Sequence, residues 1–204
     1  MARRMKQLAL PCKGRGGWRP GAGRKRNPKS GVWHVTRPKL SGREPLHITL
    51  RIRSDVPNLR NDKHFYAIQA AFREACDRFG MRLIEFSVQS NHIHLIVEAK
   101  DKGALSKGMQ GMLIRIARGV NRVSRRRGSV FSDRYHARIL KSPKEVRNAV
   151  SYVRKNFNKH VKATRPQVDP YSSMCGAALW DGEVRVAAFA KTWLMTHSGV
   201  RWLS

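Results

Sequence analysis

The succession of strand-like and helix-like patterns between residues 46 and 160 predicts an α+β fold, with a ferredoxin-like antiparallel sheet (βαββαβ) and an additional C-terminal helix. Short segments with alternating apolar residues indicate strands, and segments with helical spacing separate them. Two of the strand segments are joined only by Gln89–Asn91, a connection short enough for a hairpin. With 41% hydrophobic residues, the 204-residue chain can bury one core of ordinary domain size.

The first strand and helix are predicted from the residues after Glu44. Alternation from Leu46 to Ile52 indicates a half-buried strand, so we place the start of the domain near residue 45. After Pro57, apolar residues at helical spacing predict a helix that Gly80 ends. The apolar residues of this helix are Phe65, Ile68, Phe72, Ala75 and Phe79.

The next two strands are predicted over Arg82–Val88 and over the segment that begins at His92. Alternate residues of a strand face the same way, so His92 and His94 stand together. Ile93, Leu95 and Val97 then face the core. Two imidazoles side by side are a candidate metal site, although a chance pair on a solvated sheet face has the same pattern.

A long amphipathic helix is predicted over residues 104–126. Its core stripe consists of Leu105, Met109, Met112, Leu113, Ile116, Val120 and Val123. Beside this stripe lie Arg115, Arg118, Arg122 and Arg125. Residues 107–127 contain seven basic side chains and no acid, which favours phosphate contact over an ordinary solvated face.

A fourth strand and a last helix complete the domain. Residues 130–140 alternate, with Tyr135, Ala137 and Ile139 on one side and Arg134, His136 and Arg138 on the other. Ser142 is then placed as an N-cap, Pro143 in the first turn and Glu145 as the capping-box acid. The helix that follows should run to about Lys159.

The charge of the chain indicates a polyanionic partner. Forty-two Lys and Arg against thirteen Asp and Glu give a formal charge of +29 and a pI near 11.5. Nucleic acid is favoured over membrane, because no segment is apolar for long enough to span a bilayer and the basic N-terminus lacks an apolar signal region. Three scattered cysteines fit reduced thiols, so we expect a cytoplasmic protein.

The two ends of the chain differ in charge. Residues 1–44 carry thirteen basic side chains, one acid and many glycines and prolines, which predicts a flexible DNA-binding arm. Within the arm, the segment containing Arg19, Arg24, Lys25 and Arg26 is either a minor-groove hook or a plain phosphate-binding tail. Residues 166–204 carry three charges of each sign and three tryptophans, and we expect them to pack on the domain.

Tyr152 lies outside the apolar stripe of the last helix. That stripe comprises Val146, Val150, Val153 and Phe157. At about 100° per residue, Tyr152 is roughly 130° from its centre, and Asn156 follows one turn later. Tyr152 is therefore either an ordinary exposed tyrosine or a nucleophile. Tyr135 is the other candidate nucleophile, but it alternates with Ala137 and Ile139, which favours a packing role. With a cation on the histidine pair to polarise a phosphodiester, the phenol of Tyr152 could attack phosphorus.

The chain resembles a known family through four motifs. They are Ser90-Asn91-His92-Ile93-His94-Leu95, Phe131-x-x-Arg134-Tyr135-His136, Tyr152-Val153-x-x-Asn156 and Asp169-Pro170-Tyr171-Ser172-Ser173. From about Leu46 to Asp181, it is similar to HUH endonucleases with a single tyrosine, in particular the REP-associated tyrosine transposases.

The resemblance implies a function for residues 45–165 as the transposase domain. His92, His94 and Asn156 would bind Mg²⁺ or Mn²⁺, and Tyr152 would cut single-stranded DNA near hairpins through a covalent 5′-phosphotyrosine intermediate. We expect the DNA to contact Arg19, Arg24, Lys25, Arg26, Arg51, Arg115, Arg118, Arg122, Arg125, Arg134, His136 and Arg138.

Other readings stay open at the level of sequence. A domesticated, non-catalytic DNA- or RNA-binding protein would have the same charge, and so would a basic RNA-associated protein. Relatives include monomers and helix-exchanging homodimers, so the sequence leaves open whether Tyr152 meets His92 and His94 of its own chain.

Overall fold

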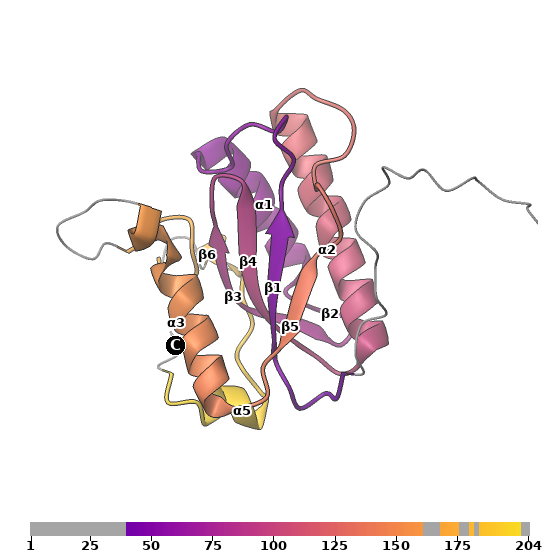
Figure 1. Ribbon diagram of the computed structural model, residues 1–204. Helices are drawn as coiled ribbons and strands as arrows, with labels where there is room; N and C mark the ends of the chain where they lie inside the picture. The colour runs from indigo at the N-terminus through magenta and orange to yellow at the C-terminus, as the bar shows by residue number, and fades with distance from the viewer. Residues whose placement is uncertain (1–39, 161–167, 176–179, 182–183, 201–204) are drawn as a thin grey trace, which may run out of the picture. The chain divides into compact units, whose positions relative to one another are not determined.

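The computed structural model describes residues 40–160, 168–175, 180–181 and 184–200, and over these ranges the chain has the expected α+β fold (Figure 1). A five-stranded antiparallel sheet has the order β2-β3-β4-β1-β5. Its strands are β1 (Leu46–Arg51), β2 (Asp77–Arg78), β3 (Met81–Val88), β4 (His92–Ala99) and β5 (His136–Ile139). The main helices are α1 (Asp62–Ala75), α2 (Lys102–Val123) and α3 (Pro143–His160). The predicted ferredoxin-like arrangement with a further helix is confirmed.

Helices pack against both faces of the sheet. Residues of α1 and α2 form the larger core cluster with one face, which includes Ile93, Leu95 and Val97 as predicted. On the other face, α3 packs its valine stripe against Ile84 and Ile96. This second cluster fixes α3 over the face of β4 that carries the two histidines.

The strand register decides which polar side chains share the α3 face. Residues directly opposite one another in an antiparallel pair point to the same side of the sheet. Thr49 of β1 pairs with His94 on one side and with His136 on the other, and Arg51 pairs with His92. The two histidines of β4 therefore lie within a polar, cationic strip that crosses three strands.

The first helix ends earlier than the spacing predicted. α1 stops at Ala75, and Phe79 does not continue its core stripe. Instead, Asp77 and Arg78 form β2 and pair with the start of β3, across a turn in which Phe79 has φ 56° and Gly80 has φ 74°. Two consecutive positive φ values are typical of a tight hairpin, and this pairing overrides the helical spacing. Phe79 is 58% exposed.

Replacing Phe79 by asparagine is expected to stabilise the fold. Phenylalanine adopts the left-handed conformation at a cost, whereas asparagine adopts it readily, so the free energy of unfolding should rise by about 0.5–1 kcal/mol. Urea denaturation measures the change. Tyr66, which is 64% exposed on α1, supplies the control: Tyr66→Asn removes an exposed aromatic from a helix and should not stabilise. An equal gain in both variants would contradict the role of the turn.

The remaining elements differ from expectation mainly in length. α2 begins two residues before residue 104 and ends at Val123, which leaves Arg125 beyond the helix with φ 49°. β5 has four residues, and its outward and inward sides are as predicted. Glu145 of α3 donates its backbone N–H to Ser142 Oγ (3.2 Å) and accepts the Lys141 N–H (2.7 Å), which caps the helix near the expected position.

The described parts of the C-terminal segment run along β3. Val88 donates its backbone N–H to Tyr171 (2.9 Å), Ser173 donates to Phe86 (3.0 Å), and Ala188 donates to Leu83 (2.7 Å). Further on lie the short strands β6 (Trp180–Asp181) and β7 (Val184–Arg185) and the helix α5 (Trp193–Thr196). The side chain of Trp193 is 62% exposed rather than buried.

Some predicted features lie outside the described residues. These are Trp202 and the N-terminal residues Arg19, Arg24, Lys25 and Arg26. Among the helices that the structure does describe, none combines the length and the apolar character needed to cross a bilayer.

Candidate active site

Side chains from β4 and α3 meet on the cationic strip. The His92 and His94 rings lie 4.7 Å apart, and the Tyr152 ring lies 5.2 Å from the His94 ring. Asn156, one turn after Tyr152, places its Nδ2 atom 3.4 Å from His92 Nε2. The structure thus brings the four sequence-predicted catalytic and metal-binding residues together within one chain. Because the valine stripe of α3 packs on the sheet, the side of the helix that carries Tyr152 and Asn156 lies close to β4.

His94 is almost fully enclosed, with 4% of its surface exposed. Its Nδ1 atom lies 3.2 Å from His47 Nε2 and 3.3 Å from Thr49 Oγ1. Its Nε2 atom is buried and has no hydrogen-bond partner among the described residues. With the proton on Nδ1, the Nε2 lone pair is available to a ligand, and an orphaned buried nitrogen is costly unless something binds it.

His92 and Asn156 can complete a donor set with His94. His92 Nδ1 lies 2.8 Å from Asn91 Oδ1, an acceptor that favours the proton on Nδ1 and leaves Nε2 as the donor atom for a metal. Asn156 is 2% exposed, and reversing its amide would present an oxygen at the same place. No cluster of three or more His, Cys, Asp or Glu able to hold a metal occurs in the described ranges. Two imidazoles and an amide oxygen nonetheless fit a divalent cation such as Mn²⁺.

His47 is a site residue that the sequence did not identify. Its ring lies 5.2 Å from the His94 ring and 5.8 Å from the Tyr152 ring. Alternation placed it correctly on the polar face of β1, but its neighbours depend on a strand pairing between residues far apart in the sequence. We find no local sequence signal that would have linked it to the histidine pair.

Burial keeps His47 and His94 uncharged. It lowers the pKa of His47 to about 4, and Coulomb interactions with His136 and Arg138 lower it further. Burial likewise lowers the pKa of His94 to about 3, with His92 and His47 as further causes. Both imidazoles are therefore neutral near pH 7, which is the form that binds metal ions.

Acidification is expected to destabilise the fold through these two residues. Above pH 6.5 they are neutral in the folded and the unfolded chain, but below it the unfolded chain binds protons that the folded chain binds only near pH 4 for His47 and pH 3 for His94. The free energy of unfolding should then fall by up to about 1.4 kcal/mol per pH unit for each residue. Urea denaturation between pH 7 and 4.5 measures the fall. His47→Gln should make it shallower, and an unchanged slope would contradict the assignment.

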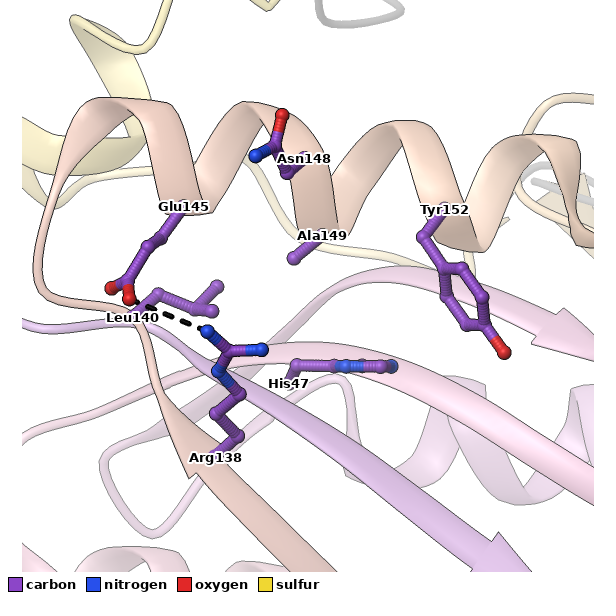
Figure 2. Close-up of a pocket in the computed structure, with 7 residues that line it drawn as sticks. All are labelled: His47, Arg138, Leu140, Glu145, Asn148, Ala149 and Tyr152. Carbon is purple, nitrogen blue, oxygen red and sulfur yellow. Dashed lines mark hydrogen bonds and ion pairs between the residues drawn. The ribbon is translucent and has the colours of Figure 1, made fainter.

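Tyr152 stands at the rim of an open hollow of about 330 Å³. Figure 2 shows its ring extending from α3 toward the sheet beside His47, with Arg138 below the helix. Arg138 Nη2 lies 3.4 Å from Glu145 Oε1. Tyr152 is 38% exposed. The hollow is lined by His47, Arg138, Leu140, Glu145, Asn148, Ala149 and Tyr152. A backbone phosphate entering it would meet an accessible phenol and a guanidinium.

The predicted DNA-binding residues fall into two groups. By register, Arg51, His136 and Arg138 share the face of the histidine pair, and Arg134 is exposed just before β5. A second group lies between α1 and α2, on the face of the sheet opposite α3. It surrounds a groove of about 420 Å³ whose lining includes several small residues. Its basic residues are Arg115, Arg118 and Arg122, and Arg125 follows beyond the helix end.

Comparisons with known proteins relate the chain to a family and to solved structures. The sequence profile of the family described as "Transposase IS200 like" matches residues 45–156, a range that ends at Asn156. Among solved structures, the chain is similar to a REP-associated tyrosine transposase bound to a REP hairpin. That match has 16% identity and a TM-score of 0.57, and it covers 85% of this chain and 100% of the other. At this identity the likeness is one of fold.

A second similar structure is a candidate transposase from Deinococcus radiodurans R1. It has 14% identity and a TM-score of 0.41, and the match covers 65% of this chain and 94% of the other. No curated protein matches the chain.

Proposed function

The chain belongs to the family of IS200-like transposases, and on this premise we propose that it is a metal-dependent single-strand DNA endonuclease and strand transferase acting near hairpins. The observation that carries the proposal is the meeting of Tyr152 and Asn156 with His92 and His94 within one chain. Tyr152 lies against a buried, neutral histidine whose Nε2 has no hydrogen-bond partner among the described residues, and this neighbour supports a catalytic role for the tyrosine.

In this proposal Tyr152 is the nucleophile. Its phenolic oxygen attacks the scissile phosphorus, the bond from phosphorus to the 3′ oxygen breaks, and that oxygen leaves with the bonding electrons and takes up a proton. The phenol loses its own proton to solvent. The products are a 5′-phosphotyrosine and a free 3′-OH, and a later attack by a 3′-OH on the phosphotyrosine rejoins DNA without a nucleotide cofactor.

In this reaction scheme three residues would hold a cation that acts on the phosphate. Mg²⁺ or Mn²⁺ bound by His92, His94 and Asn156 would supply positive charge that polarises the phosphate. Thr49 and His47 keep the proton of His94 on Nδ1, so that Nε2 stays a donor atom. Arg138 contributes a fixed positive charge within the hollow.

Single-stranded DNA with a hairpin is the substrate that we propose. The similar solved structure is described as bound to a REP hairpin, and the present chain carries a formal charge of +29. The strip with Arg51, His136 and Arg138 would hold the strand to be cut, and the groove with Arg115, Arg118 and Arg122 would contact further phosphates.

The test is to incubate the protein with labelled hairpin-containing single strands and Mn²⁺, and to look for a protein–DNA adduct that survives denaturation. We expect an adduct that depends on the metal and on a single-stranded segment beside the hairpin. The main alternative is a DNA-binding protein without catalytic activity. The groove with Arg115, Arg118 and Arg122, which lies away from Tyr152, would contact DNA in such a protein as well. Tight hairpin binding without any adduct, across a panel of hairpins, would favour that alternative.

A further inference from the structure

A partly buried guanidinium, that of Arg60, lies between α3 and the C-terminal segment. Arg60 Nη2 is 2.9 Å from Asp169 Oδ1, and Nη1 is 3.2 Å from Oδ2. The guanidinium carbon lies 4.3 Å from the centre of the Phe157 ring and 4.8 Å from that of Tyr171. The planar group is thus held by a two-point ion pair and by two aromatic contacts. We call these four residues, Arg60, Asp169, Phe157 and Tyr171, the arginine cage.

The carboxylate of Asp169 has a full set of partners. It is 1% exposed and, besides Arg60, accepts hydrogen bonds from Ser87 Oγ (3.2 Å), Gln89 Nε2 (3.4 Å) and the Tyr171 N–H (3.0 Å). These hydrogen bonds fix the position of the Asp169 carboxylate, and the carboxylate in turn fixes the guanidinium of Arg60.

The cage joins the two halves of the candidate active site. Arg60 Nη1 donates to the Val88 carbonyl (2.9 Å), and the neighbouring Leu59 N–H donates to Ser90 (3.1 Å). Val88 is the last residue of β3, and Ser90 lies in the short connection that leads into His92. On the other side, Phe157 follows Asn156 in α3. Arg60 therefore contacts the residue after one candidate ligand, Asn156, and the end of the strand that the short connection joins to the other, His92.

A second contact supports the same turn of α3. Arg154, between Tyr152 and Asn156 in sequence, forms an ion pair with Glu85 of β3, and Ser173 donates a hydrogen bond to the same carboxylate. Glu85 is 3% exposed. Two buried acids, Asp169 and Glu85, thus connect α3 to the C-terminal segment on the side of the histidine pair.

We propose that Arg60 is a positioning residue for the active site: through the arginine cage it sets the last turns of α3 so that Asn156 and Tyr152 reach His92 and His94. The inference rests on the proposed function. The valine stripe holds α3 to the sheet, but apolar contacts permit small slides and rotations, whereas a two-point ion pair stacked on Phe157 does not. The segment Asp169–Ser173, beyond the range that the family profile matches, is then part of the support of the site.

A merely structural role can be separated from positioning by a matched ion pair. Arg82 pairs with Glu98, which is 2% exposed and also accepts the backbone N–H groups of Lys191 and Thr192 from the C-terminal segment. The exposed fractions of the two arginines are similar, at 15% for Arg60 and 23% for Arg82. Glu98 lies six residues after His92 on β4, roughly 20 Å along the strand.

The experiment compares Arg60→Lys with Arg82→Lys in the full chain. Lysine keeps the charge but loses the planar, two-point contact. For each variant, the melting temperature, the Mn²⁺ affinity without DNA, the hairpin affinity and the single-turnover rate of adduct formation at saturating DNA are measured. We expect similar losses of melting temperature. Only Arg60→Lys should weaken Mn²⁺ binding and slow the adduct, each by about tenfold or more, with hairpin affinity unchanged.

Equal effects of the two variants on Mn²⁺ affinity and rate would overturn the inference, and so would wild-type values for Arg60→Lys. Asp169→Asn, which removes the charge that holds Arg60, should reproduce the defect of Arg60→Lys, whereas Glu98→Gln should not. Failure of the proposed function has a different signature, namely a wild-type protein that forms no adduct. In that case the Mn²⁺ affinities of the two lysine variants still decide whether Arg60 positions the candidate ligands.

Discussion

Replacing Tyr152 by phenylalanine should abolish the covalent protein–DNA adduct and leave hairpin affinity within about twofold of wild type. The substitution removes only the hydroxyl, which is the atom that the mechanism bonds to phosphorus, and loss of a nucleophile lowers turnover by about a thousandfold or more. The ring contacts of Tyr152 with His47 and His94 survive in the variant. Adduct formation on a denaturing gel and hairpin binding by fluorescence anisotropy measure the two properties.

Two other tyrosines serve as controls for that experiment. Tyr66→Phe changes a more exposed tyrosine on α1, and Tyr135→Phe changes the half-buried rival before β5. Both variants should form the adduct at wild-type rates. Normal adduct formation by Tyr152→Phe would rule out the assigned nucleophile, and loss of the adduct only in Tyr135→Phe would transfer the role to that residue.

Replacing His94 by glutamine should lower Mn²⁺ affinity by about a hundredfold or more, with a parallel loss of the adduct. Glutamine fills much of the same buried space, but it cannot supply the imidazole Nε2, which has no hydrogen-bond partner within the part of the chain that the structure describes. The affinity is measured by calorimetry or by the electron paramagnetic resonance signal of free Mn²⁺.

The control for the metal experiment is His136→Gln, on the same face of the sheet. His136 pairs with Thr49 in register and is not one of the three residues that we assign to the metal. Its variant should bind Mn²⁺ normally. Equal affinity in wild type and His94→Gln would exclude His94 as a ligand, and a loss in both variants would point to the general field of the strip instead.

The fold and much of the candidate site could be predicted from sequence, because they depend on local periodicity. Alternation along β4 placed His92 and His94 on the face opposite Ile93, Leu95 and Val97. The helical spacing of α3 placed Tyr152 and Asn156 away from the centre of its apolar stripe. The error at Phe79 arose where spacing alone cannot distinguish a continuing helix from a tight turn.

Features that depend on distant pairings could not be predicted in the same way. His47 reaches His94 only through the register of β1 with β4. Arg60 reaches Asp169 across 109 residues, and neither residue has a neighbour in sequence that marks it as part of a pair. Their roles depend on three-dimensional contacts that no periodicity encodes.

The C-terminal segment along β3 also bears on the solubility of shortened versions of the chain. β2 covers only the start of β3, and the backbone groups of Phe86 and Val88 are paired instead by Ser173 and Tyr171. A chain cut after residue 156 would keep the whole range that defines the family, yet it would expose an apolar strand with unpaired N–H and C=O groups. Such an edge is a template for pairing between molecules. By pairing with β3, the C-terminal segment is therefore expected to reduce aggregation.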